Sequence, residues 1–132
     1  MQDSKTVERR AAGGGLAAFL YKKRAAIVLL GGAAKGMEYQ LDQPKISLGR
    51  GPGVDLSFED QTMSRVHATI EFSGEGFVLC DAGSTNGTLL NDAAIESARL
   101  KHGDRFQLGD HVFAYTVEER TREPQAYQLP DV

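Results

Sequence analysis

The decisive stretch of this sequence runs from Gly49 to Thr88 and reads GRGPGVDLSFEDQTMSRVHATIEFSGEGFVLCDAGSTNGT. Three polar patches interrupt it, at Gly49–Arg50, Ser64–His67 and Ser84–Thr88. Each patch lies where an alternation of apolar and polar residues ends, and such alternation predicts a β-strand with one buried face. Polar residues gathered on loops that a rigid sheet holds in place are often the residues that bind. We therefore treat the three patches as the candidate site.

The chain from residue 25 onward consists of short alternating segments, and none of them has helical periodicity. Asn86–Gly87 predicts a two-residue hairpin, because both residue types tolerate positive φ. The pattern predicts an all-β domain, a sandwich or barrel of antiparallel strands. The expected strands are Ala25–Leu30, Met37–Leu41, Ile46–Leu48, Val54–Leu56, His67–Phe72, Phe77–Cys80, Thr88–Leu90, Ala94–Ile95, Arg105–Leu108 and His111–Val117.

Composition excludes several classes of protein. The 132 residues suffice for one domain, and a net charge of −3 gives no reason to expect nucleic-acid or membrane binding. The apolar run Leu16–Leu30 is divided by Lys22, Lys23 and Arg24, so we expect no transmembrane span. The single cysteine, Cys80, cannot form an internal disulfide, which is typical of a reducing, cytoplasmic setting.

The two ends of the chain differ from the middle. Gly13–Gly15 interrupts the helical tendency of residues 1–24, which we interpret as a flexible or loosely docked tail. Residues 25–118 form the predicted domain. Residues 119–132 are polar and contain two prolines, so we expect a disordered end.

An enzymatic alternative rests on Ser64, His67 and Asp81, which are the residue types of a catalytic triad. No nucleophile-elbow glycine pattern surrounds Ser64. The three histidines also lack the paired spacing of metal ligands. We therefore expect no catalysis, no metal and no cofactor.

In order and spacing, the three patches together resemble the forkhead-associated (FHA) domain family over roughly residues 27–117. The resemblance implies a β-sandwich of about eleven short antiparallel strands whose loops at one end bind a phosphothreonine in an extended peptide. The matching motifs are Gly49–Arg50, Ser64-Arg65-x-His67, Asp81-x-x-Ser84-Thr85-Asn86-Gly87-Thr88, Leu100-x-x-Gly103-Asp104 and Phe106-x-Leu108-Gly109.

The resemblance assigns five residues to the phosphopeptide. Arg50 is the expected principal anchor, because a guanidinium can meet two phosphate oxygens at once. Ser64 offers a hydroxyl, Arg65 a further donor, and Thr85 is placed near the phosphate by analogy. Asn86 has both a donor and an acceptor, so it is expected to hold the peptide backbone in register.

Four further residues, Gly49, His67, Asp81 and Gly87, are expected to support the site. The resemblance gives His67 a hydrogen-bonding role between loops without ligand contact. Gly49 is expected to let the backbone turn beside the arginine. Asp81 is expected to brace the loop that ends at Gly87.

The predicted function is phosphothreonine-peptide recognition that mediates phosphorylation-dependent protein–protein interaction downstream of a Ser/Thr protein kinase. The alternative is an FHA-like scaffold or subunit that acts without phosphate. A further hypothesis is that Thr6, once phosphorylated, binds the domain of its own chain. A plain disordered tail is the alternative to it.

Overall fold

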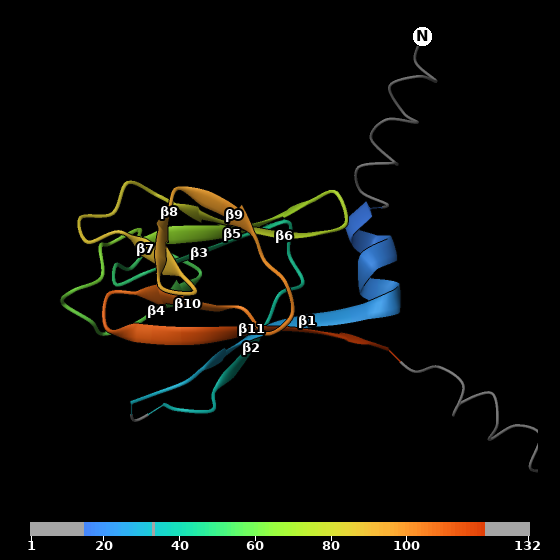
Figure 1. Cartoon of the computed structure of the whole chain (residues 1–132), viewed down its shortest axis with the longest axis horizontal. Coiled ribbons are helices and arrows are strands. Elements are labelled where there is room, and N and C mark those ends of the chain that lie inside the picture. The colour runs from blue at the N-terminus through green and yellow to red at the C-terminus, as the bar shows by residue number, and fades with distance from the viewer. Residues whose placement is uncertain (1–14, 33, 121–132) are drawn as a thin grey trace, which may run out of the picture.

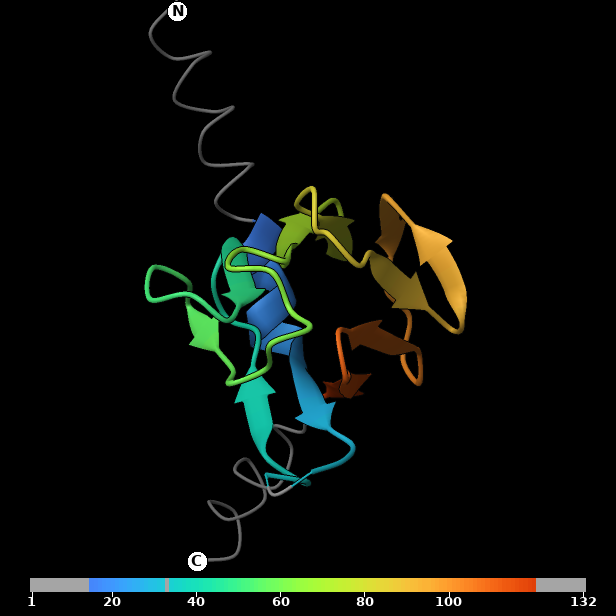
Figure 2. The same cartoon turned by 90° about the vertical axis from the view of Figure 1, so that its left-hand side faces the viewer.

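The computed structural model describes residues 15–32 and 34–120, and these form a sandwich of two sheets (Figures 1 and 2). One sheet has the strand order β2-β1-β11-β10-β7-β8 and the other β4-β3-β5-β6-β9. The strands are β1 (Lys23–Leu29), β2 (Glu38–Gln40), β3 (Lys45–Gly49), β4 (Leu56–Ser57), β5 (Ala68–Ser73), β6 (Gly76–Asp81), β7 (Thr88–Leu90), β8 (Ala93–Ile95), β9 (Ser97–Arg99), β10 (Arg105–Leu108) and β11 (His111–Glu119).

The predicted all-β sandwich of about eleven strands is confirmed, with two differences in detail. Strand β9 was not predicted, because Ser97–Arg99 is short, polar and lies at a sheet edge, where no apolar alternation is needed. Strand β4 pairs with β3 in parallel, through Leu48↔Leu56, whereas the other pairings are antiparallel. The chain makes a wide turn after β3 and returns in the same direction.

The predicted hairpin at Asn86–Gly87 is wrong. Strands β6 and β7, which flank it, lie in different sheets, so residues 82–87 carry the chain from one sheet to the other. Of the pair Asn86–Gly87, only Gly87 has positive φ, at 85°. The two-residue reversal lies instead at Asn91–Asp92, between the paired strands β7 and β8, with φ of 49° and 73°. Positive φ at both positions is the signature of a type I′ turn.

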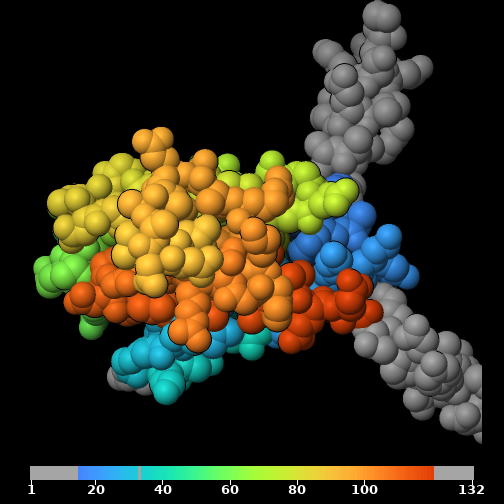
Figure 3. Space-filling model, in the orientation of Figure 1, coloured from blue at the N-terminus to red at the C-terminus, as the bar shows by residue number. Residues whose placement is uncertain are grey.

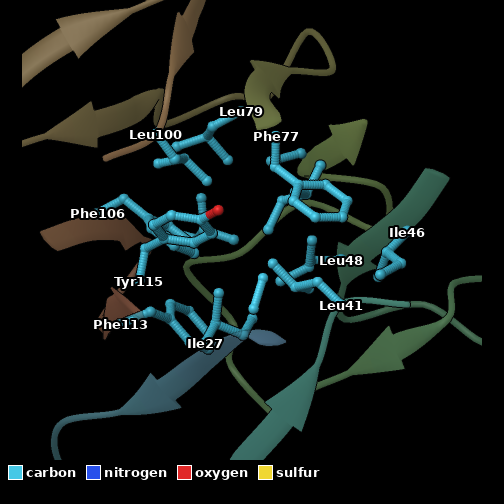
Figure 4. Packing of buried hydrophobic residues seen from close by; sticks show 14 of the residues in the cluster. Ile27, Leu41, Ile46, Leu48, Phe77, Leu79, Leu100, Phe106, Phe113 and Tyr115 are labelled. Atoms are coloured by element: carbon cyan, nitrogen blue, oxygen red, sulfur yellow. The ribbon is translucent and has the colours of Figure 1, made fainter. Parts of the chain in front are cut away.

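The core lies between the sheets, where inward-facing side chains of both layers meet (Figure 4). Ile27, Leu48, Leu79 and Phe113 are each 0% exposed. Burying a side chain of this size is worth roughly 1.5–3 kcal/mol. The sandwich therefore gives its loops a rigid base.

A helix over residues 15–22 closes one end of the sandwich. Phe19 is 9% exposed and packs edge-to-face on Phe72 and Phe77, at ring-centroid distances of 5.3 and 5.6 Å. Strand pairing then begins with Lys23 opposite Glu119. The expected tail over residues 1–24 therefore overlaps the folded part of the chain, because an aromatic anchor follows the triple glycine.

The loops that carry the three polar patches lie at the opposite end of the sandwich from this helix (Figure 1). They connect β3 to β4, β4 to β5 and β6 to β7. Figure 2 views the molecule from this end, with the three loops toward the viewer. In the described part of the chain, no helix is long and apolar enough to cross a membrane.

Candidate functional site

Gly49 ends strand β3 in a position that only glycine can occupy. A Cβ atom at Gly49 would lie 1.9 Å from the carbonyl oxygen of Arg65. The two segments are joined by N–H groups of Arg50 and Gly51, which donate to the carbonyls of Ser64 (3.1 Å) and Arg65 (3.2 Å). Gly49 is therefore required for close backbone approach, and not for the turn that the sequence suggested.

Arg50 and Arg65 project from these joined segments, and both are exposed. Among the described residues, neither guanidinium donates a hydrogen bond or forms an ion pair. A guanidinium is always charged at neutral pH and offers five donors. Two unneutralised cations therefore lie on adjacent loops at this end of the sandwich.

Ser64, Thr85 and Asn86 tie two of the loops together. The N–H of Thr85 donates to Ser64 Oγ at 3.0 Å. The amide Nδ2 of Asn86 donates to the carbonyl of Thr62 at 2.8 Å. Because Ser64 Oγ accepts here, its own hydroxyl proton remains available to another acceptor.

His67 is 0% exposed and bonds to backbone groups with both ring nitrogens. Its Nδ1 accepts from the N–H of Ser64 at 3.0 Å, which leaves the proton on Nε2. That Nε2–H donates to the carbonyl of Gly87 at 2.8 Å. Neither nitrogen is free to serve Ser64 Oγ as a base, so the geometry does not form a catalytic triad.

Asp81 organises the β6–β7 loop. Its Oδ2 accepts from the N–H groups of Gly83 (2.9 Å) and Ser84 (3.1 Å), and its Oδ1 accepts from the hydroxyls of Ser84 and Thr88. Burial raises the pKa of Asp81, but these hydrogen bonds outweigh burial and hold the pKa below its ordinary value. The hydroxyl of Ser84 in turn accepts from the N–H of Gly87 at 2.9 Å.

A second carboxylate, which is buried and was missed in the sequence, fixes the β4–β5 loop to the β10–β11 turn. Asp60 is 8% exposed and accepts from the N–H of Thr62 and of Asp110, from the Thr62 hydroxyl, and from His111 Nδ1 at 2.7 Å. Burial raises its pKa, yet the bonds from Thr62, His111 and Asp110 lower it to about 2. The pattern Asp60-x-Thr62 signals a local turn, but nothing in the sequence identifies His111 as its distant partner.

We refer to Asp60 and its partners Thr62, Asp110 and His111 as the Asp60 clamp. Thr62 links this clamp to the candidate site. Gly109 in the β10–β11 turn leaves room for it, since a Cβ there would lie 2.5 Å from Thr62 Oγ1. The carbonyl of the same Thr62 accepts from Asn86. Asp60 therefore sets the position of a predicted site residue that it does not contact.

The structure brings all nine site and supporting residues predicted in the domain to one end of the sandwich. The possible phosphoacceptor, Thr6, lies outside the described residues. Exposed guanidinium groups, a free hydroxyl proton and an amide suit a tetrahedral oxyanion on an extended chain. No cluster of three or more metal-binding side chains occurs within residues 15–32 and 34–120. The site residues are Gly49, Arg50, Ser64, Arg65, His67, Asp81, Thr85, Asn86 and Gly87.

Comparison with known sequences identifies relatives of this arrangement. The FHA domain family model matches residues 46–109. The glycogen accumulation regulator GarA of Mycolicibacterium smegmatis is 42% identical over 78 residues, which cover 59% of this chain and 49% of that protein. An oxoglutarate dehydrogenase inhibitor of Corynebacterium jeikeium is 37% identical over 78 residues, 59% of this chain and 54% of that protein. The chain thus spans about half the length of these curated relatives.

Solved structures give the same family. An FHA domain from a structural and functional study of phosphothreonine-dependent FHA interactions has a TM-score of 0.65 and 31% identity, over 70% of this chain and 95% of that one. Mycobacterium tuberculosis EmbR in complex with a low-affinity phosphopeptide has a TM-score of 0.67 and 27% identity, over 75% of this chain and 26% of that one. With the sandwich, the site geometry and these matches in agreement, the chain belongs to the FHA domain family.

Proposed function

We propose that this chain is a phosphothreonine-peptide recognition module that mediates phosphorylation-dependent protein–protein interaction. The observation that carries the proposal is the pair of exposed, unneutralised guanidinium groups of Arg50 and Arg65 on loops that a hydrogen-bond network holds in place. A phosphate brings a charge of about −1.5 to −2 and three acceptor oxygens. The two cations match that charge, and preorganised loops reduce the entropy lost on binding.

Within this proposal each site residue has a role. Arg50 is the main phosphate ligand, the role that the family resemblance gives it, and its guanidinium makes no competing contact with described residues. The hydroxyl proton of Ser64 donates to a phosphate oxygen, with Arg65 and Thr85 completing the cradle. Asn86, held by Thr62, uses its remaining amide groups to bind the peptide backbone.

The module acts in a regulatory and non-catalytic way, downstream of a Ser/Thr protein kinase. Support comes from relatives named as a glycogen accumulation regulator and as an oxoglutarate dehydrogenase inhibitor. Support also comes from a similar structure in complex with a phosphopeptide. The partner is a protein that carries phosphothreonine.

An oriented phosphothreonine peptide library beside its unphosphorylated twin tests the proposal. The parent chain should select phosphopeptides, and Arg50→Ala should weaken them at least about tenfold, the equivalent of losing a charge-assisted hydrogen bond of roughly 1.5–3 kcal/mol. The residues selected around the phosphothreonine would then define the class of partner. Equal capture of both libraries by the parent would contradict the proposal.

A phosphate-independent scaffold role is the alternative. It predicts that a natural partner binds equally well before and after phosphatase treatment and that Arg50→Ala leaves this binding intact. The two proposals therefore make opposite predictions for the same variant.

Phosphorylated Thr6 as an internal ligand stays a proposal about residues that the structure does not describe. The helix over residues 15–22 limits it, since only residues 7–14 separate Thr6 from that helix, and the connection spans at most about 30 Å when extended. The helix lies at the far end from the site loops (Figure 1). Nuclear magnetic resonance spectra of the Thr6-phosphorylated chain at several concentrations would test it: concentration-independent shifts at Arg50 and Ser64 support internal binding, and unchanged spectra exclude it.

A further inference from the structure

A groove lies at the helix end of the sandwich, away from the phosphopeptide site. It measures about 490 Å³ and is bordered by the helix over residues 15–22, the β5–β6 turn, β9 and the last part of β11. Figure 3 shows this face, where blue, yellow-green, orange and red segments meet. Phe19, Leu100 and Val117 form its apolar wall. We refer to it as the helix-end groove.

Tyr115 gives this groove an unused hydrogen-bond donor. The residue is 2% exposed, lines the groove, and its ring packs in the core beside Leu100 and Phe106 (Figure 4). Its hydroxyl makes no hydrogen bond with the described residues. No fully enclosed side-chain oxygen or nitrogen among them lacks a partner, so the Tyr115 hydroxyl is open to the groove. The groove is therefore where a ligand atom can satisfy it.

Burial raises the pKa of Tyr115 to about 12, while the cation of Arg99 acts in the opposite direction and Asp104 adds to the rise. The hydroxyl therefore stays protonated at neutral pH and can donate. Arg99 and Tyr115 line the same groove.

Arg99 supplies a cation at the rim. Its Nη1 donates to the carbonyl of Ser73 at 2.9 Å, which fixes the guanidinium across the β5–β6 turn. Its Nη2 would lie 3.5 Å from a Cβ at Gly74, so the glycine leaves this nitrogen uncovered. Among the described residues no bond from Nη2 is formed.

The side chains that line the groove carry a positive excess. Lys23 lines the groove and approaches Glu119 at 4.0 Å, and both side chains are well exposed, so the pair is weak. Glu75 is the one anionic residue in the lining, against the cations Lys23 and Arg99. An anionic group that passes Glu75 can contact both the Arg99 guanidinium and the Tyr115 hydroxyl, which line the groove.

A second depression of about 400 Å³ continues the groove along the helix. It shares Phe19, Lys23, Gly74 and Glu75 with the first and extends it to Ala18. Together the two depressions run from Leu100 past Phe19 to Ala18, which suits an extended polypeptide.

We propose that the helix-end groove binds an unphosphorylated acidic segment of a partner polypeptide, with an apolar side chain on Phe19, Leu100 and Val117 and an adjacent carboxylate on Arg99 and Tyr115. The carboxylate accepts from the Arg99 guanidinium and from the Tyr115 hydroxyl. The groove and the phosphopeptide site lie at opposite ends of the domain, so one partner can occupy both. Two linked contacts increase affinity beyond either alone.

The test is a nuclear magnetic resonance titration of the isotope-labelled full chain with the model peptide acetyl-GELFEG-amide and its neutral twin acetyl-GQLFQG-amide. The acidic peptide should shift the signals of Phe19, Gly74, Leu100 and Val117, and the neutral twin should bind about fivefold more weakly or worse. Arg99→Gln and the shape-preserving Tyr115→Phe should each weaken the acidic peptide by about threefold or more.

Three outcomes would overturn the proposal. These are no shift at the groove residues, equal affinity for the two peptides, or equal affinity of Tyr115→Phe and the parent for the acidic peptide. A chain without residues 121–132 gives a further comparison. If this deletion, with no peptide added, changes the signals of the same groove residues, the occupant is the chain's own C-terminal segment and not a partner. Arg50→Ala should retain groove binding, which separates this test from that of the phosphopeptide site.

Discussion

The two ends of the sandwich are stabilised by different kinds of interaction. At the site end, Asp60, His67 and Asp81 are polar side chains that bond almost entirely to loop backbone and hydroxyl groups. At the helix end, Phe19, Phe72 and Phe77 pack edge-to-face. Directional bonds fix the orientation of loops, whereas apolar packing covers the core and tolerates small movements. The hydrogen bonds at the site end therefore fix the backbone of the loops that carry Arg50 and Arg65.

The substitution that we expect to disrupt the loops at the site end most is Gly49→Ala. The new Cβ would lie 1.9 Å from a backbone carbonyl oxygen, so the β3 end and the loop of Ser64 must separate. We expect a loss of about 3 kcal/mol or more in the free energy of unfolding, together with loss of phosphopeptide binding. Urea unfolding measures it. Gly53→Ala is the matched control, since no atom lies within 4 Å of its new Cβ, and a similar loss in that variant would refute the close-approach argument.

The helix end is tested by Phe19→Ala. Removing a nearly buried aromatic side chain should cost about 3 kcal/mol in the free energy of unfolding. Phosphopeptide affinity should change by less than about twofold, because the site loops do not depend on the helix. Ala17→Ser on the exposed side of the same helix is the control. A large loss of affinity in folded Phe19→Ala protein would show that the two ends are coupled.

The Asp60 clamp gives a smaller effect that depends on pH. The folded-state pKa of Asp60 falls from 3.8 to about 2, so its ionised form stabilises the fold above pH 4, and this contribution is lost as the pH falls towards 2. Asp60→Asn should cost about 1–2 kcal/mol at pH 7 and flatten the loss of stability between pH 4 and 2. Unfolding curves across this range measure it, with exposed Asp92→Asn as control. An unchanged pH slope would show that Asp60 is not the group responsible.

Most of the fold could be predicted from the sequence, because alternation of apolar and polar residues indicates a strand with one buried face. Nearly every strand of this domain has such a face. Strand β9 was not predicted, because Ser97–Arg99 lies at the edge of a sheet, where strand pairing does not require apolar residues. The Asn86–Gly87 prediction failed because turn propensity is local, whereas the crossing between sheets is a tertiary requirement. Asn91–Asp92 shows that the same local chemistry does form a hairpin where the flanking strands pair.

The candidate site, like the fold, contains residues that the sequence predicts and residues that it does not. Arg50, Ser64 and Asn86 were identified because the order and spacing of their motifs resemble the FHA family, and the charge and donors of their side chains agree with that assignment. The clamp between Asp60 and His111 could not be predicted, since its partners lie 51 residues apart and neither has an unusual sequence context. Long-range partners of buried carboxylates emerge only when the loops are folded together.

The most direct test of the central claim compares Arg50→Ala with the parent chain by calorimetric titration of one selected phosphothreonine peptide, with an unfolding curve for each protein. Arg105→Ala, an exposed arginine on β10, is the control. We predict at least about tenfold weaker binding for Arg50→Ala with a free energy of unfolding within about 0.5 kcal/mol of the parent, and no change in either for Arg105→Ala. Parental affinity in the Arg50→Ala variant would contradict the assignment of this end of the sandwich as a phosphate-binding site.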